Sequence, residues 1–263
     1  MTPTSGIHHI WWCPTGPLAF LPLHAAGAYF QPSGPKLSDF SISSYTPSLT
    51  ALLPKSLSQK SINKQLLTIS LPTESWLPGT AKEVELVISH AQKFSVLKLH
   101  ESEANKQCVS DAIKASTWVH FACHGMQNTS NPTKSCLLLS GHTELTLSDI
   151  IKLRLENAEL AFLSACETAT GDQKLEEEAV HLAAGMLLAG FHGVIATMWT
   201  IQDAIAPDIA DETYRLLFKE YNADSTHAAE ALHFAIRKVC KDRQARGLKT
   251  PLLWWVPFIH IGI

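Results

Sequence analysis

The chain has 263 residues, of which 46% are hydrophobic and 17% are charged, and its net charge at neutral pH is −3. This composition excludes a disordered chain, which would be poorer in apolar residues and richer in net charge. It also argues against a nucleic-acid-binding protein, because scattered Lys and Arg and a pI near 6.5 provide no broad positive field. A chain of this length can bury a large core.

The first 60 residues carry few periodic patterns. Residues Ile7–Cys13 predict a strand that stops at a turn containing Pro14 and Pro17, and a short apolar piece, Leu18–Leu23, follows. Residues 31–60 are rich in Ser, Pro and Lys, so we expect loops around one short helix near Ser48–Leu53.

From Gln65 onward, strand patterns alternate with helix patterns. This alternation predicts an α/β fold with a mostly parallel sheet covered by helices. The predicted strands are Gln65–Ser70, Phe94–Leu99, Trp118–Cys123, Cys136–Leu139, Leu160–Ala165, Gly193–Met198 and Leu252–Ile261. The predicted helices are Ala81–Lys93, Glu103–Ala115, Leu147–Leu153, Glu176–Leu188, about Ala204–Tyr221 and about Thr226–Arg246. We assign Trp254, Trp255 and Phe258 to the sheet core rather than to an exposed apolar edge.

The run of residues 179–202 contains no Asp, Glu, Lys or Arg and is long enough to cross a bilayer. We nevertheless predict no membrane span, because the run contains histidines and glycines and changes midway from Ala/Leu-rich to β-branched. The N-terminus does not resemble a secretory signal. The six cysteines show neither dense pairing nor a CxxC motif, so we expect a reducing, cytoplasmic location.

Two predicted strands end in residues that can perform chemistry: one leads into His124 and Gly125, the other into Cys166. Because the carboxyl ends of neighbouring parallel strands share one crevice, these residues can meet there. A thiol and an imidazole are the minimal set for nucleophilic acyl transfer, in which Cys166 attacks and His124 protonates the leaving amine. The backbone N–H groups of Gly125 and Cys166 are the natural donors to the oxyanion, and Gly125 has no Cβ to obstruct a carbonyl.

These residue types also have structural roles. A cysteine at the end of a buried strand is more often a small core residue than a nucleophile, and we assign the other five to that role. They are Cys13, Cys108, Cys123, Cys136 and Cys240. We also expect a structural role for His120. A metal site made of His120, Cys123 and His124 is disfavoured, because no second ligand pair appears at zinc-like spacing; we expect neither a metal nor a cofactor.

Several longer segments carry recognisable motifs: GPLAFLPLHAAG (16–27), YTPSLTALL (45–53), LPGTAKEVELV (77–87), VHFACHG (119–125), LAFLSACETATGD (160–172), HLAAGMLLAGFHGVIATMWTIQD (181–203), ALHFAIRK (231–238) and PLLWWVPFIHIG (251–262). Together they resemble the CHAT domain, a caspase- and separase-related cysteine peptidase module that is often appended to tetratricopeptide repeats. The resemblance extends over most of the chain. It implies a single domain, residues 1–263, with a less regular N-terminal portion (1–75) and a catalytic core (76–263).

The resemblance implies a caspase-like three-layer α/β/α sandwich in which His124 and Cys166 are the catalytic dyad and Gly125 and Cys166 form the oxyanion hole. MWTIQD (198–203) is similar to the LW-x-V-x-D stretch of separases, whose acidic residue binds a basic P1 side chain. Asp203 is therefore the candidate for recognising Arg or Lys. Equally, Asp203 could be the N-cap of a helix beginning near Ala204. Glu167 and Thr168 are further substrate-binding candidates of lower rank.

We therefore expect a cysteine endopeptidase acting on a protein or peptide, regulated by a partner such as a tetratricopeptide-repeat sensor. We expect a monomer that binds neither nucleic acid nor membrane; the sequence does not indicate a need for calcium. The alternative is a catalytically silent CHAT module that serves as an interaction or effector domain. A generic α/β hydrolase or transferase using Cys166 is less well supported, because the chain lacks a GxSxG elbow and a Gly-rich phosphate loop.

Overall fold

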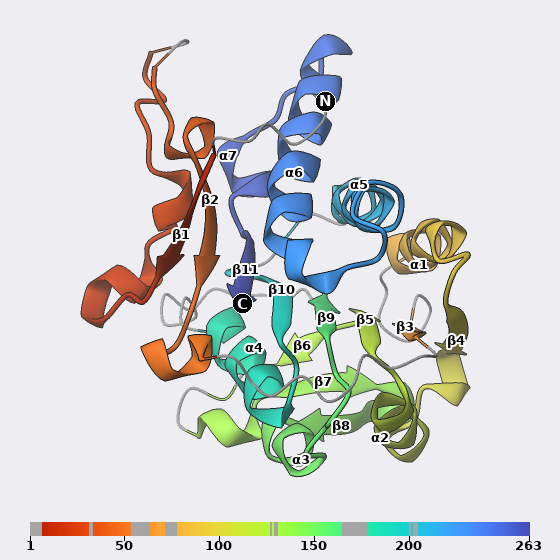
Figure 1. The fold of residues 1–263 in the computed structure, drawn as a ribbon. Coiled ribbons are helices and arrows are strands. Elements are labelled where there is room, and N and C mark those ends of the chain that lie inside the picture. The colour runs from red at the N-terminus through yellow and green to blue at the C-terminus, as the bar shows by residue number, and fades with distance from the viewer. Residues whose placement is uncertain are drawn as a thin grey trace.

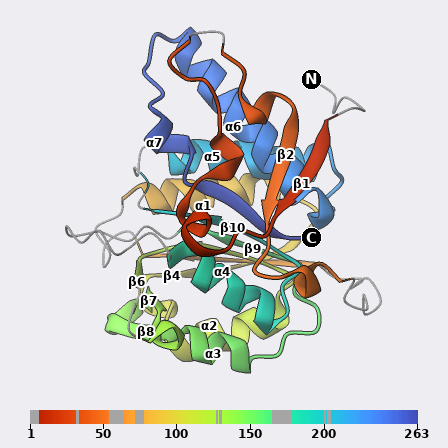
Figure 2. The same ribbon diagram turned by 90° about the vertical axis from the view of Figure 1, so that its left-hand side faces the viewer.

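The computed structural model describes residues 7–31, 34–53, 64–71, 78–126, 128, 131–164, 178–199, 201 and 205–263. In the described residues, helices cover both faces of a central sheet, so the chain forms three layers (Figures 1 and 2). The helices are α1 (Gly79–His90), α2 (Lys106–Ala115), α3 (Leu147–Lys152), α4 (Glu178–Ala189), α5 (Ala206–Lys219), α6 (Ala228–Ala245) and α7 (Leu252–Trp255). The predicted α/β class with a mostly parallel sheet is confirmed.

Within the described residues, the central sheet has eight strands: β1 (His8–Trp12), β2 (Ser41–Tyr45), β3 (Gln65–Ser70), β4 (Ser95–His100), β5 (Trp118–Ala122), β9 (Leu160–Leu163), β10 (Gly193–Thr197) and β11 (Phe258–Gly262). Their order across the sheet is β1-β2-β11-β10-β9-β5-β3-β4. Strands β10, β9, β5, β3 and β4 run parallel to one another, whereas β11 is antiparallel to β10 and parallel to β2. The parallel strands therefore end at one common edge, which is where both predicted catalytic residues follow in sequence.

A second, three-stranded antiparallel sheet branches from this edge. It consists of β6 (Gly125–Met126), β7 (Cys136–Leu139) and β8 (Thr143–Thr146) in that order. Strands β6 and β8 are absent from the sequence prediction. They are too short to give a pattern of alternating apolar and polar residues, and β7 holds both of them by pairing.

Local sequence signals explain where the helices begin and end. Asn105 caps α2, because its Oδ1 accepts a hydrogen bond from the Cys108 N–H at 3.0 Å. Pro207 lies in the first turn of α5, where a missing N–H costs nothing. Gly190 ends α4 with φ 131°, and a Cβ there would lie 2.1 Å from the Leu155 carbonyl oxygen, so only glycine fits this turn.

The structure corrects the sequence prediction at both ends of the chain. Residues 31–60 do contain a short helix near the expected place, Leu49–Leu52, but they also contain β2, which the sequence did not predict. Leu252–Ile261 is not one strand: α7 comes first and β11 begins at Phe258. Phe258 is buried as expected, while Trp254 and Trp255 are partly buried against the same core.

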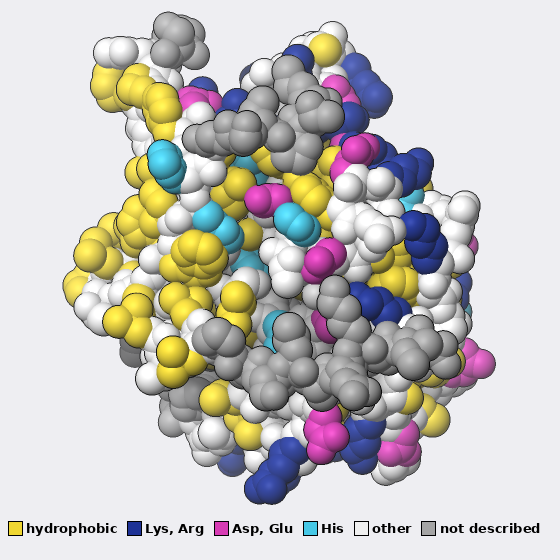
Figure 3. Space-filling model, viewed as in Figure 1, with side chains coloured by type: hydrophobic (Ala, Val, Ile, Leu, Met, Phe, Trp, Pro, Cys, Tyr) yellow, Lys and Arg dark blue, Asp and Glu magenta, His cyan; other side chains and the backbone are white. Residues whose placement is uncertain are grey.

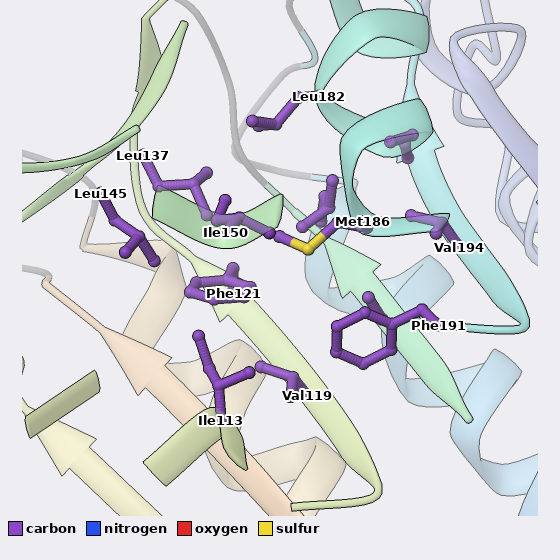
Figure 4. Packing of buried hydrophobic residues seen from close by; sticks show 14 of the residues in the cluster. Ile113, Val119, Phe121, Leu137, Leu145, Ile150, Leu182, Met186, Phe191 and Val194 are labelled. Carbon is purple, nitrogen blue, oxygen red and sulfur yellow. The ribbon is translucent and has the colours of Figure 1, made fainter. Parts of the chain in front are cut away.

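Two apolar clusters lie on opposite faces of the sheet. One packs Val119 and Phe121 of β5 against α2, α3 and α4 (Figure 4). The other packs Trp118 of β5 and Phe162 of β9 against α1, α5 and α6. Alternate residues of a strand point to opposite faces, and the buried strands therefore serve both clusters at once.

The N-terminal strands join the sheet beside β11 (Figure 2). Hydrophobic side chains gather on this side of the molecule (Figure 3). Among the described residues, those that are large, apolar and exposed here are Trp11, Leu18, Leu21, Phe30, Phe40, Leu49 and Leu53. In the described part of the chain, no helix is both long and apolar enough to cross a membrane.

Candidate active site

His124 lies where the chain leaves the central sheet and enters the small one. Cys123, which follows β5, is fully buried, whereas His124 is partly exposed. The His124 carbonyl accepts a hydrogen bond from the Leu138 N–H at 2.8 Å. The backbone of His124 is thus held between two sheets, which places its side chain at the carboxyl edge of the parallel strands.

The Gly125 N–H does not take part in the pairing of β6 with β7. Gly125 lies opposite Leu137, and the next pair back, His124 and Leu138, carries the ladder hydrogen bond. Since hydrogen-bonded and non-hydrogen-bonded pairs alternate in an antiparallel ladder, Gly125 belongs to a non-hydrogen-bonded pair and its N–H points away from β7. Strand β6 is the edge strand of its sheet, so no described strand of that sheet lies on the side to which this N–H points.

Strand β9 runs beside β5 toward the same edge. Phe121 pairs with Leu163, and the Ser164 N–H donates to the Phe121 carbonyl at 2.8 Å. Ser164 precedes Cys166 by two positions, just as Ala122 precedes His124. Cys166 and its neighbours Glu167 and Thr168 lie outside the described residues.

Asp203 also lies outside the described residues, but the residues on either side of its segment are anchored. Ile201 and Ile205 are both buried in the cluster that contains Phe162. Helix α5 begins at Ala206 and its N-cap residue is Ile205. The predicted helix is therefore present and begins two residues after its expected start, and its N-cap residue is Ile205.

The other cysteines differ in burial. Cys123 and Cys136 are buried, and Cys240 is partly buried. Burial raises the pKa of both Cys136 and Cys240 to about 11, so these thiols stay protonated at neutral pH and are poor nucleophiles. The expected core role is wrong for Cys13 and Cys108, which are exposed.

His120 lies wholly inside the protein on the helix α1 side of the sheet. Its Nε2 is 3.0 Å from Oε1 of Glu83 on α1, and both side chains have almost no exposed surface. Sequence reasoning did not single out Glu83, because a glutamate beside apolar helix positions is usually exposed. It also missed a contact at the carboxyl edge, where the Ser70 hydroxyl and His100 Nδ1 are 2.9 Å apart at the ends of β3 and β4.

No group of three or more His, Cys, Asp or Glu side chains in the described parts of the chain could hold a metal ion.

The sequence model of one protein family, the CHAT domain, matches residues 2–263. The chain belongs to the CHAT domain family. A search among curated proteins finds no match. The match to the family covers the strands that lead to His124 and Cys166 as well as the N-terminal strands.

Solved structures of caspase-like peptidases share the fold of this CHAT domain. Separase in its complex with securin from Saccharomyces cerevisiae is 15% identical with a TM-score of 0.58, over 86% of this chain and 14% of that chain. The RgpB pro- and mature domains from Porphyromonas gingivalis are 14% identical with a TM-score of 0.52, over 75% of this chain and 47% of that chain. The domain thus spans less than half of either chain. At this identity the likeness establishes a caspase-like cysteine peptidase fold.

Proposed function

We propose that this CHAT domain is a cysteine endopeptidase in which Cys166 attacks the peptide carbonyl and His124 protonates the leaving amine. The observation that carries the proposal is the common edge. Strand β5 ends two residues before His124, and its neighbour β9 is paired with it to within three residues of Cys166. Two residues of chain span at most about 7 Å, so the chain length alone keeps Cys166 within that distance of Ser164, whose N–H is bonded to β5.

The Gly125 N–H supports the same proposal. It points away from its ladder and sits next to the proposed acid, as a donor to a developing oxyanion must. Cys166 would supply the second donor through its own N–H. In this mechanism the thiolate forms a bond to the carbonyl carbon, the oxyanion rests on the two N–H groups, and the amine leaves with the proton from His124.

Asp203 is our proposed determinant for a basic P1 side chain, with Glu167 and Thr168 as further substrate contacts. The anchored residues Ile201 and Ile205 hold the ends of the segment that carries Asp203 against the core beneath β9. A carboxylate between these two anchored residues would be a partner for a guanidinium or an ammonium. We also propose that a partner protein regulates the activity of this domain and that the protein is cytoplasmic.

The test is cleavage of peptides varied at P1, with and without calcium, by the wild-type protein, Cys166→Ala and His124→Asn. Cys166→Ala should lower kcat by at least about 10³-fold, because it removes the nucleophile. Matched controls are Cys108→Ala, an exposed thiol, and His142→Asn, an exposed histidine with φ 56° that asparagine tolerates. Asp203→Ala should lower kcat/KM for Arg and Lys peptides by roughly 10²-fold.

Each result has a definite meaning. Turnover that survives in Cys166→Ala would contradict the assignment of the nucleophile. An unchanged preference for basic P1 residues in Asp203→Ala would remove that residue from the pocket. No turnover by the folded wild-type protein under any condition would favour the silent interaction module. Ester turnover without peptide cleavage would favour a generic hydrolase.

A further inference from the structure

A buried polar cluster lies behind the strand that leads to His124. Its centre is the contact of 3.0 Å between His120 Nε2 on β5 and Glu83 Oε1 on α1. Thr68 of β3 pairs directly with His120 in the sheet. Tyr214 of α5 presents its ring edge-on to the His120 ring, with the centroids 5.5 Å apart. Four elements therefore converge on one imidazole.

The cluster is closed to solvent and its polar atoms are poorly satisfied. Thr68, His120 and Tyr214 have no exposed surface, and Glu83 has 2%. Among the described residues, no hydrogen-bond partner meets the geometric requirements for Thr68 Oγ1, Glu83 Oε1, either His120 nitrogen or the Tyr214 hydroxyl. Burial in this setting, and next the charge of Glu83, raises the pKa of Tyr214 well above its usual value, so the phenol remains neutral. Apolar side chains would fill this place at lower cost.

The position of the cluster connects it to every described part of the candidate site. His120 is on the strand that delivers His124, and it lies beside Phe162 of β9, the strand that leads toward Cys166. Tyr214 is on α5, which begins immediately after the segment that carries Asp203. Glu83 holds α1, and α1 in turn packs along α5. A shift of the Glu83–His120 contact would therefore move β5 and α5 relative to each other.

We propose that Glu83 and His120 are positioning residues for the peptidase site. Their buried contact fixes α1 and α5 over β5, and so sets the place of His124 relative to the other site residues. The inference rests on the proposed function. Polar contacts specify one arrangement more sharply than apolar ones, since an apolar pair can slide while keeping its contact area, and reacting groups misplaced by about 1 Å lose roughly 10²-fold in rate.

The test compares Glu83→Leu/His120→Phe with Glu83→Gln and with Ile113→Val as a control in α2 on the other face of the sheet. The apolar double variant should fold with an unfolding midpoint close to that of the wild type, because apolar groups of similar size often replace a buried polar pair without loss. Its kcat should fall about tenfold or more with little change in KM. In Glu83→Gln, which keeps the size and replaces the carboxyl group by an amide, kcat should fall about threefold, and Ile113→Val should keep the wild-type kcat.

A second readout does not depend on turnover. The pH dependence of alkylation of Cys166 by iodoacetamide, followed by mass spectrometry, reports how His124 sits near the thiol; the exposed Cys108 of the same molecule serves as the reference. The proposal predicts a shifted profile at Cys166 in the double variant and an unchanged one at Cys108. If the folded double variant has the kcat and the alkylation profile of the wild type, the positioning role of Glu83 and His120 is overturned. If the double variant does not fold, a wild-type kcat and a wild-type profile in Glu83→Gln overturn it. Peptides left uncut by the wild type would instead count against the proposed function, and the profiles would still decide the positioning role.

Discussion

The two faces of the central sheet differ in the polarity of the side chains that they bury. Toward α2, α3 and α4, the fully buried side chains of strands β3, β5, β9, β10 and β11 are all apolar. These are Leu67, Ile69, Val119, Phe121, Ala161, Leu163, Val194, Ala196, Ile259 and Ile261. Toward α1, α5 and α6, the same strands present Thr68, His120, Thr197 and His260 among their apolar neighbours.

The register of the sheet places Thr68, His120 and His260 of the second face in one row, with Phe162 and Ile195 between the two histidines. Thr68 pairs with His120, His120 with Phe162, Phe162 with Ile195, and Ile195 with His260. The row continues through a contact of 2.7 Å between His260 Nδ1 and the Ser44 hydroxyl, and from there to His9 at 2.8 Å. Since apolar residues suffice to bury the first face of this sheet, burial alone does not account for the polar row.

The largest effect should come from the apolar face. Phe121→Ala removes a fully buried ring that packs among Leu137, Leu145 and Ile150 (Figure 4), so it should lower the free energy of unfolding by about 3–5 kcal/mol. Denaturant unfolding at several pH values measures it. The loss should be the same at pH 5 and pH 8, because no titratable group faces the ring from these strands. A loss that varies with pH would contradict the division between the faces.

A smaller, pH-dependent effect should come from the buried histidines. Burial lowers the pKa of His24 and His233 to about 4 and that of His260 to about 3. In the unfolded chain these groups bind a proton near pH 6.5. Above that pH they are neutral in both states and contribute nothing to the pH dependence; as pH falls from 6.5 toward 4, only the unfolded chain gains protons and stability is lost.

His260→Leu should reduce this dependence by about 1.4 kcal/mol per pH unit between pH 6 and pH 4, which is the contribution of one proton. The neighbouring groups that could change this slope are His9 and Ser44, which lie in the same row. The charge of Glu230 affects the pKa of His9 in turn. Val194→Ala, which faces α4, is the control and should leave the slope unchanged. An unchanged slope in His260→Leu would mean that His260 titrates in the folded protein as it does in the unfolded chain.

The sequence predicted those features that depend on local pattern. Buried strands such as β5 and β9 are continuous apolar runs, and the residues that follow them could therefore be assigned to one edge. Strand β2 was missed because Ser41, Ser43 and Ser44 make it polar; it forms because β1 and β11 pair with its two sides. Glu83 was missed because its burial depends on His120, which is distant in sequence. Contacts of this kind are set by tertiary packing, which no local pattern encodes.

The smallest loss of unfolding free energy should come from the polar contacts at the rim of the apolar face. The Thr146 hydroxyl accepts a hydrogen bond from the Asp149 N–H at 3.1 Å, and the Thr146 N–H donates one to the Asp149 carboxylate at 3.0 Å; together they cap α3. Burial raises the pKa of Asp149, but hydrogen bonds from Lys106 and Thr146 outweigh this effect and hold the pKa below its usual value. Thr146→Ala should cost about 1 kcal/mol of unfolding free energy at pH 7.

Between pH 6.5 and pH 4 the slope of stability in Thr146→Ala should match that of the wild type. A carboxyl group with a lowered pKa contributes stability above its unfolded value near 4 and loses it only as pH falls further. Lys106→Met, which removes the partly exposed ion pair to Asp149 and keeps the cap, should cost less than the loss of the cap itself. A changed slope above pH 4 in Thr146→Ala would show that the rim titrates together with the histidine row, and the two faces would then be coupled through the sheet.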